Sequence, residues 1–555
     1  MTAERPPSGG GDRRFAIQWS GILMLMLALP LVVGVALTPP GATWTWIYVN
    51  PGDSFIYLAQ AGQGSGGQWG FVNVWTWQPM PNVPLFPFYS LLGHLVPGAV
   101  FGPTSVGFAY QAARLVIAGL TLWQAWKLLR EVTPSLVARR VGFLLAFFGS
   151  GFGLYELAVP ALREAPRGLW DLYFGESSTF GALIGVPHHG LVLLAFIFAM
   201  RAFLSLLSRP QGNWRAAGVA AAATAVVAMV HPDKVAVLLL TAALAVLWLA
   251  PREAFRLPLL GQLGLVVAAG SAWLGVLLVL VLGRPESAGL ALRGSHLPNP
   301  NPLFYLLGLG LPGLLALWAA PVTRARLRRA SPGQVVAWSF VVASVLETCI
   351  PTDLVDHRLE GVQLALAGIA AGALVHGLVP RLGRAGWFNR LAAWRGLPMD
   401  RRRLRSLAIN LVVLAAVPTT LVTLVSFSAT PVNGARDLYL EPGGAEAMAW
   451  IRGHTEPDAV ILATPPTARF IAAYGVRHVA FGNASMTPDY DAEERATAQF
   501  FRPGEMDRHG YLRARRVSYL YFGVLEAATV AFEPRTEGYL QPVYENGKVT
   551  IFRVT

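Results

Sequence analysis

The sequence predicts a polytopic α-helical membrane protein with about 11 transmembrane helices and a small C-terminal α/β domain outside the cytoplasm. Of the 555 residues, 54% are hydrophobic and only 14% are charged, whereas soluble proteins carry about 25% charged residues. Apolar runs of about 20 residues, the length that crosses a bilayer, recur as far as residue 430. Residues 431–555 instead have the hydropathy and charge density of a water-soluble domain.

The first apolar run, residues 17–37, predicts a membrane anchor that stays on the protein. It follows a polar segment, residues 1–15, which we expect to be a disordered cytoplasmic N-terminus ending in Arg13 and Arg14. A cleaved signal peptide has a shorter apolar run and a small-residue cleavage site. The length of the run and its lack of a clear cleavage site therefore favour a transmembrane helix.

Further apolar runs within residues 16–430 predict the other transmembrane helices. Their expected starting points are Thr104, Val141, Ala182, Ala216, Val235, Leu259, Leu303, Gln334, Gly361 and Leu407. The runs 216–230 and 235–250 are short, and only His231-Pro-Asp-Lys234 separates them. This segment predicts a tight hairpin between two half-length spans, or a turn in which Lys234 or His231 reaches a phosphate.

Basic residues set the expected orientation, because cytoplasmic loops are enriched in Lys and Arg. The basic segments are 127–140, 209–215, 252–256, 324–329 and 381–405. They fall in every second loop, so these loops and the N-terminus are expected to be cytoplasmic. With an odd number of spans, residues 431–555 lie outside the inner membrane of a bacterium. The net charge of +13 is thus a sign of membrane topology, and we expect no nucleic-acid partner.

The C-terminal segment alternates strand and helix signals, which predicts a small α/β domain. The expected helices are residues 443–453 and 491–501, and the expected strands are 459–463, 478–481, 517–521 and 549–554. Neither a glycine-rich phosphate loop nor a paired-cysteine motif occurs there, and the one cysteine, Cys349, excludes an internal disulfide. The glycosylation sequon at Asn483 is interpreted as a chance match.

Polar and ionisable residues gather at the expected outer ends of the spans. They are Asp53, Glu176, His188, His189, His231, Asp233, Lys234, Arg293, His296, Asp353, Asp356, His357, Arg358 and Glu360. Ionisable residues at this depth are costly and usually face a cavity or a partner. Because all of these residues are expected on the same side of the membrane, they predict a water-filled, charged cavity at the outer leaflet.

Asp53 lies just outside the first span, at the start of a long outer loop, residues 39–103. A carboxylate there is well placed to deprotonate an acceptor hydroxyl as a general base. Alternatively, it caps a helix in the loop. The loop tryptophans, Trp69, Trp75 and Trp77, predict an interfacial aromatic belt or a wall on which a sugar stacks.

The histidines and arginines have competing interpretations. Because adjacent positions on a helix point about 100° apart, His188 and His189 are expected to bind substrate or cap the helix rather than share a metal. Arg358 either pairs with an acidic neighbour or binds a lipid phosphate with two parallel hydrogen bonds. Arg114 lies inside an expected span, where a cation needs an acid or an anion beside it.

The segment Pro51-Gly-Asp-Ser-Phe-Ile-Tyr-Leu58 resembles the acidic first-loop motif of the GT-C superfamily of integral membrane glycosyltransferases. The layout of the whole chain and the segment 445–473 are similar to bacterial protein-mannosyltransferase-like and aminoarabinose-transferase-like members. Many relatives carry a second acid after the first, where this chain has Ser54. That departure puts a metal-dependent mechanism in doubt, unless Glu176 supplies the second acid.

The expected function is transfer of a sugar from a polyprenyl-phosphate donor to an extracytoplasmic acceptor, which could be a glycan, a lipid or a protein. Nucleotide sugars are not ordinarily available outside the cytoplasm, so a donor carried by a membrane lipid fits better. Asp53 is the expected base. The expected donor-phosphate ligands are Arg358, Lys234 and Arg293, and the expected substrate-binding residues are Tyr57, Glu176, His188, His189, His231 and His357. No cofactor is certain, and a divalent metal stays open.

Two alternatives remain at the level of sequence. A transporter or flippase for a lipid-linked or anionic substrate would show internal repeats and helices broken at the midplane. The two short spans around His231 hint at the second feature, but no repeat is clear. A non-catalytic membrane scaffold would have no need for acids and bases gathered on one side.

Overall fold

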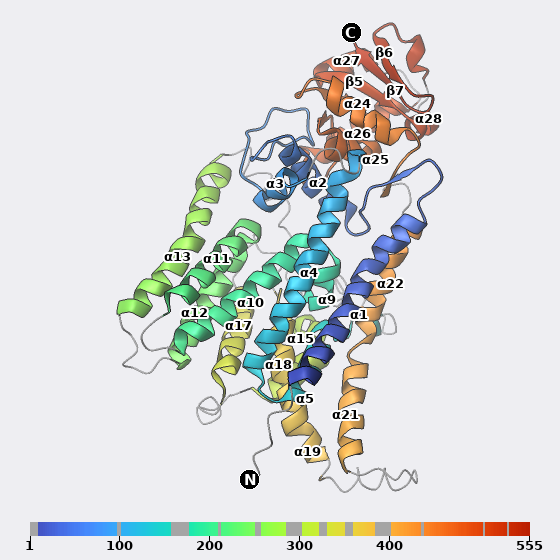
Figure 1. Ribbon diagram of the computed structural model, residues 1–555. Coiled ribbons are helices and arrows are strands. Elements are labelled where there is room, and N and C mark those ends of the chain that lie inside the picture. Colours follow the sequence, from blue (N-terminus) through green and yellow to red (C-terminus); the bar gives the residue numbers. More distant parts are fainter. Residues whose placement is uncertain are drawn as a thin grey trace. The chain divides into compact units, whose positions relative to one another are not determined.

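The computed structural model describes residues 9–96, 102–156, 177–208, 213–249, 257–284, 302–320, 330–349, 359–382, 384, 401–433, 438–502, 506–529 and 532–555. The chain divides into two compact units. The helical unit comprises Met1–Ala28, Arg114–Leu274 and Leu297–Ser426, and the mixed unit comprises Leu29–Ala113, Gly275–His296 and Phe427–Thr555. Figure 1 labels the helices and strands of both.

Seven helices among the described residues are long and apolar enough to cross a membrane, which confirms the polytopic helical prediction. They are Gly11–Ala36, Gly102–Val132, Pro187–Leu207, Pro232–Leu249, Pro258–Leu282, Val362–Leu382 and Arg402–Val432. Two shorter apolar helices, Trp214–Val230 and Tyr305–Trp318, accompany them. The sequence predicts about 11 spans, and the described residues account for seven of them.

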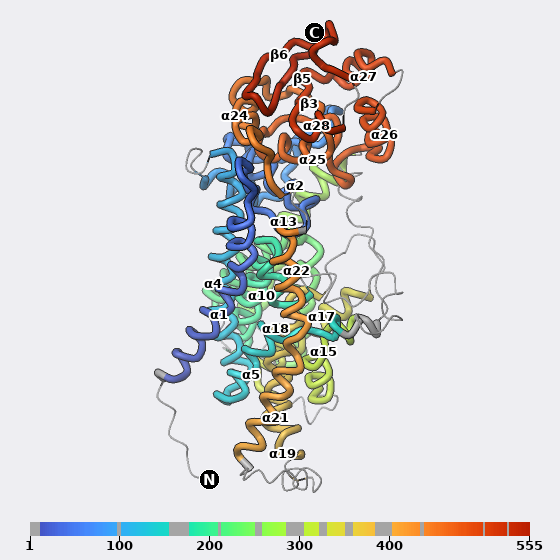
Figure 2. The backbone as a smooth tube through the Cα atoms, turned by 90° about the vertical axis from the view of Figure 1, so that its right-hand side faces the viewer, coloured from blue at the N-terminus to red at the C-terminus, as the bar shows by residue number. Residues whose placement is uncertain are grey.

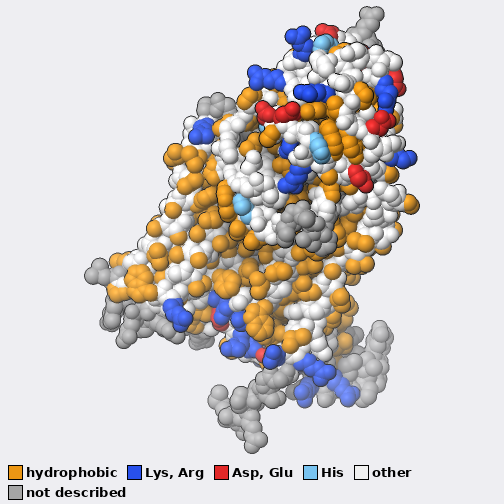
Figure 3. Space-filling model, turned by 45° about the horizontal axis from the view of Figure 1, so that its top comes forward, with side chains coloured by type: hydrophobic (Ala, Val, Ile, Leu, Met, Phe, Trp, Pro, Cys, Tyr) orange, Lys and Arg blue, Asp and Glu red, His pale blue; other side chains and the backbone are white. Residues whose placement is uncertain are grey.

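Large apolar side chains on the helices face outward, as lipid contact requires. Leu25 is 74% exposed, Leu247 is 70% exposed and Leu414 is 66% exposed. Figure 3 shows hydrophobic side chains spread over the helices on the face in view. In water such a surface would be an aggregation site, so the helical unit is built for a bilayer.

Three helix boundaries differ from the expected ones. Helix α1 (Gly9–Ala36) begins inside residues 1–15, which were expected to be disordered. Helix α5 (Leu136–Phe147) rises only about 18 Å over its 12 residues, too little for a bilayer core of about 30 Å. The span expected near Ala182 is split, because α9 (Thr179–Ile184) ends before Pro187 starts α10 (Pro187–Leu207).

The core of the helical unit is a set of neighbouring helices (Figure 1). Helix α10 packs against α11 (Trp214–Val230), and α12 (Val235–Leu249) packs against α17 (Pro332–Thr348). Helix α18 (Val362–Ala373) packs against α5 and against α15 (Pro302–Trp318). Fully buried alanines, including Ala217, Ala220 and Ala228 on α11, let helices approach closely.

The remaining spans flank this core. Helix α4 (Ser105–Val132) and α13 (Leu257–Leu277) are long, and α21 (Arg401–Ala415) is followed end to end by α22 (Pro418–Asn433) in Figures 1 and 2. Helix α15 contains a kink at Gly310, whose φ of 56° is left-handed. A Cβ there would lie 2.6 Å from the Ser150 carbonyl oxygen, so only glycine fits.

The mixed unit contains a five-stranded sheet in the order β4-β3-β5-β7-β6. The strands are β3 (Val460–Leu462), β4 (His478–Val479), β5 (Val517–Phe522), β6 (Leu540–Glu545) and β7 (Thr550–Val554). Strand β3 is parallel to β4 and β5, whereas β7 is antiparallel to β5 and β6. Together with α24 (Gly444–His454) and α26 (Tyr490–Phe501), these elements confirm the predicted α/β tail.

The first loop packs onto this tail. Strand β1 (Thr43–Trp44) pairs with β2 (Tyr439–Leu440), and Val479 donates its backbone N–H to the Val74 carbonyl at 2.9 Å. Trp75 is fully buried, so it belongs to neither an interfacial belt nor an exposed sugar-stacking wall. Residues 39–103 therefore belong largely to the same compact unit as the tail.

Candidate functional site

Three buried histidines meet in the helical unit. His188 and His189 occupy the first turn of α10, because Pro187 is pre-organised for a helix start and lacks an N–H to satisfy. His231 ends α11, and Pro232 then begins the short helix η3 (Pro232–Lys234). The ring centroids lie 4.3 Å apart for His188 and His189 and 5.1 Å apart for each pair with His231.

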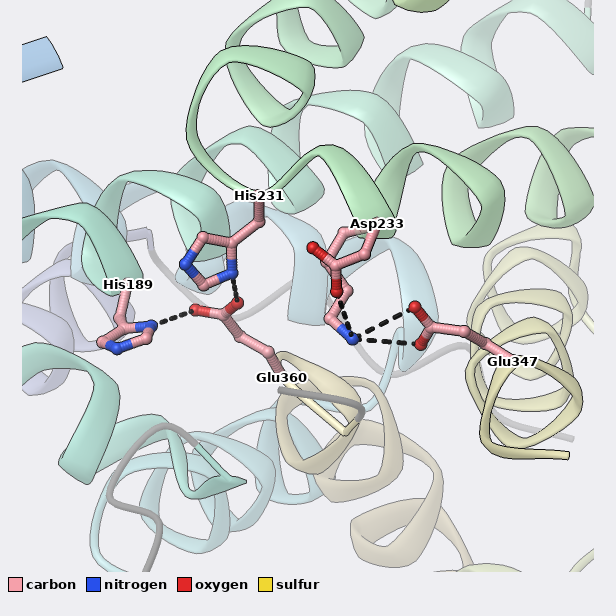
Figure 4. Close-up of polar contacts among 6 residues, drawn as sticks. His189, His231, Asp233, Glu347 and Glu360 are labelled. Carbon is pink, nitrogen blue, oxygen red and sulfur yellow. Dashed lines mark hydrogen bonds and ion pairs between the residues drawn. The ribbon is translucent and has the colours of Figure 1, made fainter. Parts of the chain in front are cut away.

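Glu360 lies between two of these rings (Figure 4). Its Oε1 is 3.2 Å from His189 Nδ1, and its Oε2 is 3.1 Å from His231 Nδ1. The Glu360 side chain is 0% exposed. Burial disfavours its charged form, but the neighbouring rings of His231 and His189 outweigh that effect, so the pKa of this carboxyl lies well below its usual range. The cluster thus holds a buried carboxylate flanked by two imidazoles.

The three rings are candidate metal ligands. One nitrogen from each of His188, His189 and His231 lies within 4.8 Å of the others. The rings of His188 and His189 lie closer together, with centroids 4.3 Å apart, than the 100° between adjacent helix positions suggested. Zinc–nitrogen bonds of about 2.0–2.1 Å require closer nitrogens, so the rings would draw together on binding. Nδ1 of His189 and of His231 faces Glu360, the kind of carboxylate contact that orients a histidine ligand.

Lys234 forms a separate buried ion pair with Glu347 and Asp233, two residues that Figure 4 labels. Its Nζ is 3.1 and 3.0 Å from the two carboxylate oxygens of Glu347 and 3.2 Å from Asp233 Oδ2. The side chains of Lys234 and Glu347 are 1% and 2% exposed. A donor phosphate would have to displace these carboxylates, so the arrangement favours the hairpin interpretation of residues 231–234 over phosphate binding by Lys234.

Arg114 is buried in the helical unit, and two of its contacts are with main-chain carbonyls. It is 2% exposed and donates to two main-chain carbonyls, those of Leu183 at 3.0 Å and Leu27 at 2.9 Å. An acid or anion was expected beside it. These carbonyls tie α4 to α1 and α9, which gives the side chain a structural role.

Asp53 lies in the mixed unit, in the first turn of α2 (Pro51–Ser65). Asn50 caps this helix, and its Nδ2 donates to Asp53 Oδ2 at 2.5 Å. The Asp53 backbone N–H points back to Asn50 Oδ1 at 3.5 Å. The alternative that Asp53 helps cap a loop helix is therefore realised. Asp53 is only half-buried, so its carboxylate also remains accessible, and the two roles are compatible.

Tyr57 and Asn483 support the Asp53 helix. Tyr57 follows Asp53 by one helical turn, which places it on the same side of α2, and its ring stacks on Tyr89 at 4.6 Å. Asn483 Nδ2 donates to the Gly52 carbonyl at 2.9 Å. Asn483 is 7% exposed, which agrees with its sequon being a chance match. The tail thus holds the backbone next to Asp53.

The structure brings together some of the expected site residues. His188, His189 and His231 meet around Glu360, with Lys234 in a neighbouring ion pair. Glu176, Arg293, His357 and Arg358 lie outside the described residues. Sequence reasoning missed Glu347, Asn50 and Asn483. An acid inside the expected span that starts near Gln334 was a usable signal for Glu347, because such an acid needs a partner.

The fold matches solved membrane glycosyltransferases along almost the whole chain. The arabinofuranosyltransferase AftD from Mycobacteria matches with a TM-score of 0.53 and 15% identity, over 98% of this chain and 40% of AftD. ArnT from Cupriavidus metallidurans matches with a TM-score of 0.50 and 15% identity, over 97% of this chain and 98% of ArnT. The chain has the GT-C fold.

The oligosaccharyltransferase of Archaeoglobus fulgidus also matches, with a TM-score of 0.48 and 14% identity, over 97% of this chain and 74% of that protein. At the level of sequence, no family model and no curated protein matches this chain.

Proposed function

We propose that this GT-C chain is a glycosyltransferase that moves a sugar from a polyprenyl-phosphate donor to an extracytoplasmic acceptor. The observation that carries the proposal is the fold, which the chain shares over 97% or more of its length with two GT-C glycosyltransferases. A donor anchored in the bilayer also suits a chain with long apolar helices. The acceptor is a hydroxyl-bearing glycan, lipid or protein.

Asp53 is the proposed base. Its carboxylate is half-buried and fixed by Asn50 at a helix start, which gives a defined direction for taking a proton from the acceptor hydroxyl. Departure of the sugar leaves a lipid phosphate, which needs positive charge around it. We propose Arg358 and Arg293 for that role, because Lys234 is already paired with Glu347.

The proposal is tested by donor consumption in reconstituted protein. Purified chain in proteoliposomes is given polyprenyl-phosphate sugars, or nucleotide sugars as the comparison, together with an extract of hydroxyl-bearing glycan, lipid and protein acceptors, and free polyprenyl phosphate is quantified by mass spectrometry. We expect lipid-linked sugars alone to be consumed. Transbilayer movement of an intact donor without release of polyprenyl phosphate would support the flippase alternative instead.

We further propose that the basic loops are cytoplasmic and the tail lies outside, from the alternation of arginine-rich segments. In a Cys349→Ser background, Gly453→Cys gives an exposed thiol, and a Cβ at Gly453 meets no atom within 4 Å. A membrane-impermeant maleimide added to intact cells should label this variant and leave Arg395→Cys unlabelled. The reverse pattern would overturn the orientation and, with it, the donor argument.

The histidine cluster is proposed to hold one transition-metal ion, because imidazole suits Zn, Cu, Fe and Ni. Such an ion would supply positive charge at the site. After incubation with zinc and dialysis, elemental analysis should find bound metal in the full chain and much less in His231→Ala. Glu360→Gln should weaken binding about 10–100-fold, because Glu360 orients two of the ligands.

The control for metal binding is His454→Ala, which removes an exposed histidine of the tail and should leave the metal content unchanged. Equal zinc uptake by wild type, His231→Ala and Glu360→Gln would show that the cluster is not a metal site.

A further inference from the structure

A cavity of about 430 Å³ lies within the helical unit, apart from the histidine cluster. It is lined by the end of α15, the start of α17, α18, the π-helical turn Leu374–Leu378 and α19 (Val379–Leu382). Pockets that bind small molecules have volumes of about 300–1,000 Å³. The cavity is therefore large enough for a small ligand or a lipid headgroup.

Its lining combines aromatic walls with cationic and polar groups. Trp318 and Trp338 contribute the walls, and His376, Gln334 and Arg381 contribute the polar groups. None of the described residues that line it is acidic. The lining is therefore suited to a ligand that has both a negative charge and apolar groups.

Arg381 is held in place by an aromatic ring rather than by an acid. Its guanidinium lies 4.8 Å from the centre of the Trp318 ring, a contact that orients the cation without neutralising it. Among the described residues, no carboxylate forms an ion pair with Arg381. The planar group keeps its donor edge for a phosphate, which it can bind through two parallel hydrogen bonds.

The ring of Trp318 packs closely against Gly377. A Cβ at Gly377 would lie 2.8 Å from it, so glycine at this position of the π-helical turn makes room for the tryptophan. π-Helical turns occur frequently at functional sites. Gly377 therefore fixes the position of the Trp318 ring, and that ring in turn positions the Arg381 guanidinium.

The surroundings point to a lipid. Leu314, Leu317 and Trp318 on α15 are 43%, 52% and 43% exposed, and their spacing of three and four residues puts them on one helix face. This apolar face leads away from the cavity along the outside of a helix, where an acyl chain can lie. Arg381, Arg384 and the arginine-rich start of α21 put the cavity at the basic ends of the spans.

We propose that this cavity binds the headgroup of an anionic phospholipid, with Arg381 on the phosphate, Trp318 and Trp338 against the glycerol region, and an acyl chain along Leu314 and Leu317. Basic pockets between transmembrane helices at the cytoplasmic side are known to hold anionic headgroups. The proposal does not depend on the glycosyltransferase assignment, because it concerns only which class of lipid the folded protein binds.

The test is native mass spectrometry of the full chain, titrated in separate arms with phosphatidylglycerol, phosphatidylcholine and polyprenyl phosphate. Wild type should retain phosphatidylglycerol in preference to both other lipids. Arg381→Gln keeps a planar polar group but loses the charge, and it should weaken phosphatidylglycerol binding about 10–100-fold. The matched control is Arg384→Gln, which removes an exposed neighbour whose Nε donates to the Pro380 carbonyl.

Each of the following four outcomes would overturn the proposal. Equal retention of phosphatidylglycerol by wild type and Arg381→Gln would show that the cavity does not select the phosphate. A preference for polyprenyl phosphate would assign the cavity to the donor lipid or its product. An equal loss in Arg384→Gln would reduce the effect to general surface charge. Binding of phosphatidylcholine as tightly as phosphatidylglycerol would remove the role of the headgroup charge.

Discussion

Replacing Asp53 with asparagine should lower turnover about 10²–10⁴-fold while leaving donor binding nearly unchanged, because it removes a general base without removing volume. The fold of the loop should survive the change. Asn50 Nδ2 donates to Asp53 Oδ2, and an asparagine carbonyl can accept the same hydrogen bond. The measurement is a single-turnover assay with a lipid-linked sugar, beside a titration of donor binding.

The matched control for this prediction is Asp491→Asn. Asp491 is an exposed acid in the first turn of α26, another helix of the mixed unit, so it shares the helix position of Asp53 without the proposed chemistry. It should leave turnover unchanged. Full turnover by Asp53→Asn would leave Asp53 with its capping role alone. The base would then have to be sought at Glu176, Asp356 or Asp233, the last of which is already paired with Lys234.

Replacing Lys234 with methionine should destabilise the chain by about 3–5 kcal/mol, because it leaves the Glu347 carboxylate buried without its cation. Glu347→Gln should cost less, because Asp233 Oδ2 still lies 3.2 Å from Lys234 Nζ. The double variant Lys234→Met/Glu347→Leu replaces both charges with apolar groups and should be more stable than either single variant. Thermal or denaturant unfolding in detergent measures all three.

The control pair for these variants is Arg535 and Glu545, whose side chains are 49% and 52% exposed. Arg535→Met should cost less than about 1 kcal/mol, since water and salt screen an exposed pair. If Lys234 instead binds the donor phosphate, the double variant will fold but lose donor affinity. A single Lys234→Met variant as stable as wild type would contradict the buried-pair interpretation itself.

The helices and the tail were largely predictable because their signals are local. Apolar runs gave the starts of α4, α11 and α12 within two residues, with expected starts at Thr104, Ala216 and Val235. Short runs of β-forming residues predicted β3, β5 and β7. Strand β6 was missed, because Pro542 and an exposed pattern weaken its signal.

The partners of the site residues were not predictable, because they depend on contacts distant in sequence. Strand β1 pairs with a segment almost 400 residues later, Thr43 with Leu440, and this contact moves the first loop into the mixed unit. His189 meets Glu360, which lies 171 residues away along the chain. The sequence placed both at outer span ends, but neither spacing nor composition indicates which ring faces which acid.

The central claim is that the Asp53 carboxylate takes the proton from the acceptor hydroxyl while a lipid-linked sugar is bound. It is tested most directly by an experimental structure of the Asp53→Asn variant in nanodiscs with a polyprenyl-phosphate sugar bound. The account predicts the sugar beside the side chain at position 53, with reacting atoms about 3–3.5 Å apart. A donor bound elsewhere, with position 53 more than about 20 Å from the lipid phosphate, would contradict it.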